Sequence, residues 1–143
     1  MADELQFIQD ILNNNWNKNN TDNRKPIIDK IFNLKRADMS PNQDYVLLYL
    51  VSGSYTITPL GLGTNEKESL VISIDIRTMI TRSHSLKIRE EIMRILRENK
   101  ILNPDLKKFN VIRMERINDL TDKSIGLYRQ VLDLRCEDFR VVA

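Results

Sequence analysis

Leu70-Val71-Ile72-Ser73-Ile74-Asp75-Ile76-Arg77 is the stretch that decides the fold, because apolar and polar side chains alternate along most of it. Alternation with a period of two predicts a β-strand that has one face on a core. The even-numbered positions then face the core, while Ser73, Asp75 and Arg77 face outward. We therefore expect a sheet with one apolar face and one charged face.

Three further runs are typical of strands: Tyr45 to Val51, Asn110 to Ile117 and Tyr128 to Glu137. The first is almost continuously apolar, which predicts a strand covered on both faces, or covered on one face and touching a partner on the other. The last alternates, with one side formed by Tyr128, Leu132, Leu134 and Cys136, and the other by Arg129, Asp133, Arg135 and Glu137. Together with Arg113 and Glu115 on the third run, these charges extend the mixed-sign face across the sheet.

Two segments have helical spacing of apolar residues, from about Glu4 to Trp16 and from Leu86 to Glu98. Ser83 and Ser85 are start signals for the second helix. The resulting order is helix, strand, strand, helix, strand, strand. It predicts a single α+β domain over residues 1–143, with an antiparallel sheet of about four strands backed by two helices.

The connecting segments are unusual in length and composition. An Asn-rich and basic stretch covers residues 13–36, and within it residues 26–32 fit either a helical turn that starts at proline or an extended segment. Residues 53–69 form a connection far longer than a tight hairpin turn, with Gly61-Leu62-Gly63-Thr64 as its expected tip. A long arm of this kind is often a contact element, and its charged candidates are Glu66, Lys67 and Glu68.

Composition excludes several functional classes. The chain has 22 basic and 20 acidic residues, so its net charge of +2 gives no strong field for binding nucleic acid or an anionic membrane. Its single cysteine excludes an intramolecular disulfide framework and a Cys-rich zinc site. The acidic N-terminus leads into no apolar segment, and no apolar run approaches the roughly 20 residues that a membrane helix requires. The sequence predicts a protein made and kept in the cytoplasm, whose partners are proteins.

No residue pattern predicts catalysis, a metal or a cofactor. His84 has no second ligand at metal-binding spacing and fits an ordinary helix start, and Cys136 lies on an apolar strand side, where a thiol is a small hydrophobic group. The Gly61 to Thr64 segment lacks the lysine of a phosphate-binding loop. Asp75 followed by Asp105-Leu106-Lys107 weakly imitates the acidic metal pair and lysine of a nuclease.

The element order and several stretches resemble the tail-terminator and tail-completion proteins of long-tailed phages and archaeal tailed viruses. The resemblance covers about Met1 to Glu137 and is carried by residues 44–53, 71–77, 88–92 and 127–129. It implies a small antiparallel sheet backed by helices, and a homo-oligomeric ring, expected to be a hexamer, that caps the tail tube and joins it to the head connector or stopper protein. Genome DNA would pass through the lumen of such a ring, and the protein would be located in the virion tail or neck after assembly in the host cytoplasm.

The leading hypothesis is therefore a structural ring component without catalysis. Alternating charges suit a repeated interface, because acidic groups on one protomer meet basic groups on the next. The interface candidates are Asp75, Arg77, Arg113, Glu115, Arg129, Asp133, Arg135 and Glu137 on the sheet, and Glu66, Lys67 and Glu68 on the arm. Two alternatives stay open: a metal-dependent nuclease or nucleic-acid-processing protein, and a host regulatory or adaptor domain.

Overall fold

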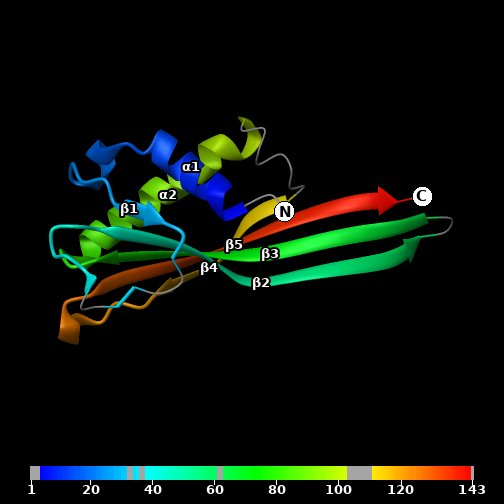
Figure 1. Cartoon of the computed structure of the whole chain (residues 1–143). Helices are drawn as coiled ribbons and strands as arrows, with labels where there is room; N and C mark the ends of the chain where they lie inside the picture. The colour runs from blue at the N-terminus through cyan, green and yellow to red at the C-terminus, as the bar shows by residue number, and fades with distance from the viewer. Residues whose placement is uncertain (1–3, 32–33, 36–37, 61–62, 103–110, 143) are drawn as a thin grey trace.

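The chain folds into one curved sheet with two helices on one face (Figure 1). The structure is a computed structural model that describes residues 4–31, 34–35, 38–60, 63–102 and 111–142, with side chains described over 5–31, 34–35, 38–51, 69–99 and 114–136. The helices are α1 (Glu4–Asn15) and α2 (Arg82–Leu102), and the strands are β1 (Ile27–Asp29), β2 (Tyr45–Leu60), β3 (Gly63–Thr78), β4 (Val111–Asp119) and β5 (Tyr128–Val142). Short 3₁₀ helices occupy Lys18–Thr21 and Lys123–Ile125.

The α+β class is confirmed, but the sheet differs from the expected one. It has five strands in the order β1-β2-β3-β5-β4, and β1 pairs with β2 in parallel while the other neighbours are antiparallel. The extra strand is the segment for which sequence left a helical turn and an extended form open. Its three residues are too few for periodicity to be visible, and only the pairing of Ile27 to Asp29 with Tyr45 to Leu47 makes it a strand.

The apolar face of the sheet is the one that sequence predicts. Leu70, Ile72, Ile74 and Ile76 are all buried, and so are Leu132, Leu134 and Cys136 on β5. Helix α2 covers this face with a stripe formed by Ile88, Ile92, Ile95 and Leu96, and α1 adds Ile8, Ile11 and Leu12. Alternating strands and amphipathic helices thus bury their apolar sides in one shared core.

Helix α2 starts earlier than its serines suggest. The backbone N–H of His84 donates to Thr81 Oγ1 at 3.0 Å, which makes Thr81 the capping residue before Arg82. Ser85 instead donates through its hydroxyl to the carbonyl oxygen of Arg82. Starting the helix at Arg82 places His84 in its first turn, below the end of β3.

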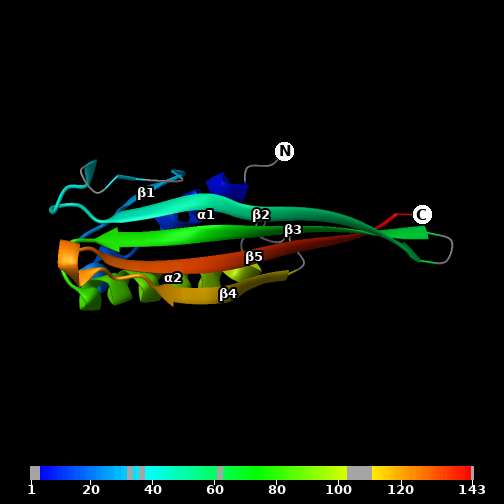
Figure 2. The ribbon, with the colours of Figure 1, turned by 90° about the horizontal axis from the view of Figure 1, so that it is seen from below.

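Strands β2, β3 and β5 are longer than predicted and continue beyond the helices as an arm (Figures 1 and 2). The sequence predicts a long hairpin arm over residues 53–69, between strands that end at Val51 and begin at Leu70. In the structure the strands themselves extend through this segment: pairing of β2 with β3 continues to Leu60 and Gly63, and β5 pairs with β3 as far as Val142. Glycine, proline and charge in this stretch disfavour strands by local preference, and the pairing of three strands overrides that preference. The expected tip at Gly61 and Leu62 lies outside the described residues.

Candidate functional site

The sheet has two edges, and they differ in how far they are covered. On one side, β1 pairs only with Tyr45 to Leu47, so β2 has no strand beside it from Leu48 onward among the described residues. On the other side, β4 is the last strand of the described sheet. Open strand edges carry unpaired N–H and C=O groups, which makes them templates for pairing with another chain.

The arm is the three-stranded continuation of this sheet. Among the described residues, the last row of paired residues that includes β4 joins Ser54, Ser69, Glu137 and Val111, and the rows beyond it are formed by β2, β3 and β5. The outermost row that includes all three strands contains Pro59, Thr64 and Val142. Proline inside a strand is confined to edges and bulges because it cannot donate a ladder hydrogen bond, which fits the position of β2 at the edge.

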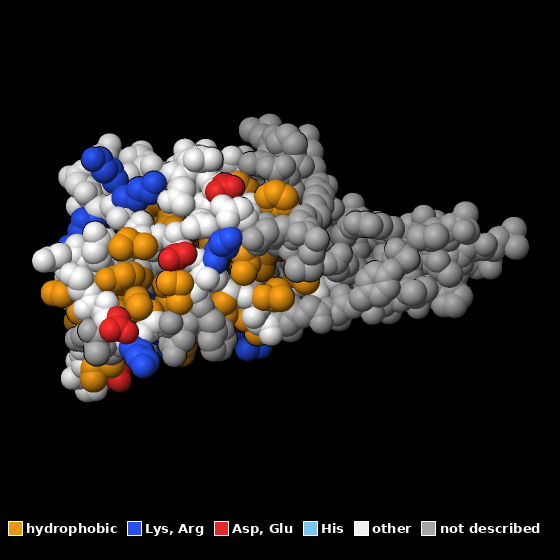
Figure 3. All heavy atoms as spheres, viewed as in Figure 1, with side chains coloured by type: hydrophobic (Ala, Val, Ile, Leu, Met, Phe, Trp, Pro, Cys, Tyr) orange, Lys and Arg blue, Asp and Glu red, His pale blue; other side chains and the backbone are white. Residues whose placement is uncertain are grey.

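Exposed apolar side chains gather beside the β2 edge. Ile27, Leu50 and Val51 are 45%, 46% and 55% exposed. The space-filling view shows apolar side chains over β1 and the adjoining part of β2 (Figure 3). An apolar group of this kind next to an open edge is typical of a contact surface.

The charged face predicted from sequence exists, but its centre is not exposed to solvent. Asp75 is 0% exposed, and its carboxylate oxygens accept from Arg129 Nε at 2.9 Å, Arg129 Nη2 at 2.8 Å and Arg77 Nη2 at 3.0 Å. Arg77 also donates to the carbonyl oxygen of Leu34 at 2.7 Å, so the chain before β2 is held against this face. Asp75 and Arg77 lie on the face that the sequence predicts for them, but both side chains are buried and not open to solvent.

The remaining charges on this face are half-buried or exposed. Arg135 donates to Glu115 through Nε at 2.8 Å and to Ser69 Oγ through Nη1, also at 2.8 Å. Asp133 accepts from the Ser73 hydroxyl. The other interface candidates have side chains outside the described residues: Arg113, Glu137, Glu66, Lys67 and Glu68.

Asp75 does not have the geometry of a nuclease metal ligand. Its oxygens are occupied by two guanidinium groups, which are cations in the place where a metal cation would bind. Asp105 and Lys107, the other members of the imitated pattern, lie outside the described residues. Within the part of the chain that the structure describes, no group of three or more His, Cys, Asp or Glu side chains could hold a metal ion.

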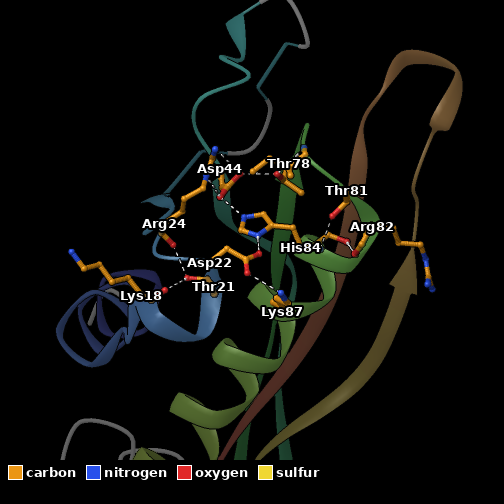
Figure 4. Close-up of polar contacts among 12 residues, drawn as sticks. Lys18, Thr21, Asp22, Arg24, Asp44, Thr78, Thr81, Arg82, His84 and Lys87 are labelled. Atoms are coloured by element: carbon orange, nitrogen blue, oxygen red, sulfur yellow. Dashed lines mark hydrogen bonds and ion pairs between the residues drawn. The ribbon is translucent and has the colours of Figure 1, made fainter.

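A second polar cluster, which the sequence did not predict, surrounds His84 (Figure 4). The ring is 1% exposed and lies between two carboxylates, with Nδ1 2.7 Å from Asp22 and Nε2 2.6 Å from Asp44. Ionised carboxylates can only accept hydrogen bonds, so both contacts form together when both ring nitrogens carry hydrogen. Asp44 also accepts from Arg24 at 3.1 and 3.2 Å and from the Thr78 hydroxyl at 2.6 Å. The cluster therefore joins the Asn-rich segment, the start of β2, the end of β3 and the start of α2.

No sequence signal indicates this cluster. Asp22 and His84 are separated by 62 positions, and Asp44 and His84 by 40, so no spacing relates them. Asp22 reaches the ring from a left-handed backbone conformation, with φ of 55°, that ends the 3₁₀ helix η1 (Lys18–Thr21). The Lys87 ammonium and the His84 ring both hold the pKa of Asp22 below its ordinary value. The Asn-rich stretch thus has a defined structural role in positioning Asp22.

The same stretch is attached to α2 at a second point. Glu91 accepts from the backbone N–H of Asn17 at 2.6 Å and from the Asn20 side chain at 3.0 Å, and Arg94 binds both of its oxygens. Burial raises the pKa of Glu91, but hydrogen bonds from Arg94, Asn20 and Asn17 outweigh it and hold the pKa below 4.5. Segment 17–22 is therefore fixed to α2 at two points, one at Asp22 and the other at Glu91.

The lowered pKa values of these carboxyl groups predict that the protein loses stability in acid. A carboxyl group whose pKa is lowered by folding stabilises the fold above its unfolded-state pKa and loses that contribution as the pH falls through its folded-state pKa. The pKa of Asp22 is lowered by Lys87 and His84, and that of Asp119 by Thr121 and Arg82. We expect the melting temperature to be nearly constant at neutral pH and to fall progressively below about pH 4.5, the ordinary value for Glu91.

Differential scanning calorimetry across a pH series measures this dependence. Glu91→Gln is the matched variant, because it keeps the side-chain shape and removes the titrating group. We expect the variant to be less stable than the parent at neutral pH, and the difference between the two to shrink as the pH falls. A constant difference at all pH values would contradict the assignment of a lowered pKa to Glu91.

No helix in the described part of the chain has the length and apolar character needed to cross a membrane. The chain was also compared with known proteins by sequence. It matches no protein-family model and no curated protein.

Proposed function

We propose that this chain is a structural, non-catalytic component of a virus tail, a terminator protein whose copies form a ring on the tail tube and join it to the head connector or stopper protein. The observation that carries the proposal is the three-stranded arm. Strands β2, β3 and β5 continue past the helical layer, which gives the molecule a body and an extended element directed away from it (Figure 2).

An arm of this form suits contact between stacked rings. The body contains the shared core, which lies between the sheet and the helices α1 and α2. The arm adds backbone length without a helical cover among the described residues. Such an element reaches beyond its own protomer, and we assign it the contact with the tail tube or the connector.

The two open edges support self-association into a ring. A contact between different surfaces of identical copies generates a closed ring when the rotation between copies closes, and a filament when it does not. We propose closure, with six copies as the expected number, and passage of genome DNA through the lumen. The protein would then belong to the virion tail or neck, after assembly in the host cytoplasm.

Multi-angle light scattering across a concentration series tests this function. The protein is measured alone and with the tail-tube protein encoded by the same genome. We expect one discrete assembly that contains the six copies of the 16.8 kDa chain expected for the ring, with the mass of any bound tube protein added, in at least one of the two conditions. A strict monomer at every concentration, with and without the tube protein, would contradict the proposal.

A further inference from the structure

We propose that the ring is built by sheet extension: the free edge of β2 in one copy pairs, antiparallel, with β4 of the next copy. The inference rests on the ring assembly proposed above and assigns its interface. Its partner is a second copy of this chain, and its contact surface comprises Leu48 to Thr58 on one side and Val111 to Asp119 on the other.

Backbone N–H and C=O groups of β2 point outward from the sheet where this pairing would form. The carbonyl oxygen of Asp44 accepts from the N–H of Ile27 at 2.9 Å, so this position directs its backbone groups toward β1. Backbone direction alternates along a strand, and Val46, Leu48 and Leu50 therefore point the same way. Strand β1 ends at Asp29, opposite Leu47, and in this parallel ladder the N–H of Leu48 still pairs with the carbonyl oxygen of Asp29. The carbonyl of Leu48 and both backbone groups of Leu50 therefore have no strand beside them in the described sheet.

The polarity of the sheet fits a repeated contact. The four strands β2, β3, β5 and β4 are antiparallel at every step, so β4 runs opposite to β2. Copies placed edge to edge in the same orientation therefore continue the alternation of strand direction, and the contact accommodates the irregularities at Val51 on β2 and Glu115 on β4. Strand β4 has 9 residues and fits within the free edge of β2, which ends before Pro59 because proline cannot donate to a new ladder.

The side chains at the two edges are complementary. Leu50 pairs with Ile72, and Ile117 pairs with Leu132, so both lie on the face that also contains the core. Paired residues of an antiparallel sheet point to the same face. Leu50 is 46% exposed and Ile117 is 43% exposed. Joining the two edges places them on one continuous apolar face, next to Val51 at the irregularity between Leu50 and Ser52.

A two-fold contact between two β2 edges is the competing arrangement. It would also be antiparallel, but it would leave β4 and the exposed Ile117 uncovered in every pair and would close at a dimer. Pairing of β2 with β4 covers both edges, repeats around a ring and directs every arm the same way. These features favour the unlike pair.

Site-specific cross-linking distinguishes the two arrangements. Leu50→Cys and Ile117→Cys are made separately in a Cys136→Ala background, then mixed and treated with a short bis-maleimide, which tolerates an offset of about two rows. Ile80→Cys, at an exposed position between β3 and α2, is the matched control. Non-reducing gels give the covalent products, and light scattering of each unmodified variant gives its assembly state.

We expect a covalent dimer from the mixture of Leu50→Cys and Ile117→Cys, and none when either of these two variants is mixed with Ile80→Cys. The double variant, with both cysteines in one chain, should give a ladder that ends at the size of the ring. A dimer formed by Leu50→Cys alone would overturn the inference in favour of the two-fold contact. A ring without any Leu50 to Ile117 product would overturn it while leaving the proposed function intact, whereas absence of any ring would overturn both.

Discussion

Replacing Asp44 with alanine is expected to lower the free energy of unfolding by about 3–5 kcal/mol, the range for removing one partner of a buried ion pair. Asp44 is 1% exposed and accepts hydrogen bonds from Arg24, Thr78 and His84. Its removal leaves the buried His84 ring and the Thr78 hydroxyl without their shared acceptor. Because small domains have about 5–15 kcal/mol of stability, the loss would be a large share of the total. Urea unfolding followed by circular dichroism measures it.

Asp22→Ala is the matched control, because Asp22 contacts the opposite nitrogen of the same ring. Its side chain is 47% exposed, so water replaces the lost carboxylate. We expect it to cause only a small fraction of the loss measured for Asp44→Ala. Equal losses in the two variants would contradict the view that burial of Asp44, rather than its charge on His84, gives the cluster its importance.

The apolar framework could be predicted from sequence because it follows from patterns between residues that are close in the sequence. Alternation over Leu70 to Arg77 and helical spacing in α2 each require only a short window of residues, and the buried positions match both. Strand β1 and the strand structure of the long arm depend instead on pairing with segments that are distant in the sequence. Ile27 to Asp29 becomes a strand through its pairing with β2, and the arm becomes a sheet because β5 reaches as far as Val142.

The polar clusters were harder to predict than the core. Sequence placed Asp75 and Arg129 on the correct face but could not show that they bind each other, since the contact depends on register between β3 and β5. It also could not show that Arg77 donates a hydrogen bond to the carbonyl oxygen of Leu34, which places the chain before β2 against the sheet. The His84 cluster joins segments distant in sequence, and no motif relates them. Burial of charge is a tertiary property, so alternation predicts which face a charge is on and not whether solvent reaches it.

Asp75→Ala is expected to cost about 3–5 kcal/mol of unfolding free energy, because it leaves the Arg77 guanidinium buried without its carboxylate. Arg77 is 7% exposed, and Arg129 is left with both of its contacts to Asp75 broken. The covering segment at Leu34 should also loosen, since the same guanidinium binds its carbonyl oxygen. Urea unfolding gives the stability, and hydrogen exchange at the amides near Leu34 gives the local effect.

Glu115→Gln is the control on the same face, because its pair with Arg135 is exposed at both ends, at 35% and 27%. Exposed pairs contribute about 0–1 kcal/mol, so this variant should be nearly as stable as the parent. The two variants also separate stability from assembly. If Glu115→Gln abolishes the ring while the monomer stays stable, the Glu115 charge contributes to the contact between protomers, on the β4 edge where the sequence also placed an interface residue. If the ring persists, this charge is not needed for assembly, and its pair with Arg135 belongs to the protomer alone.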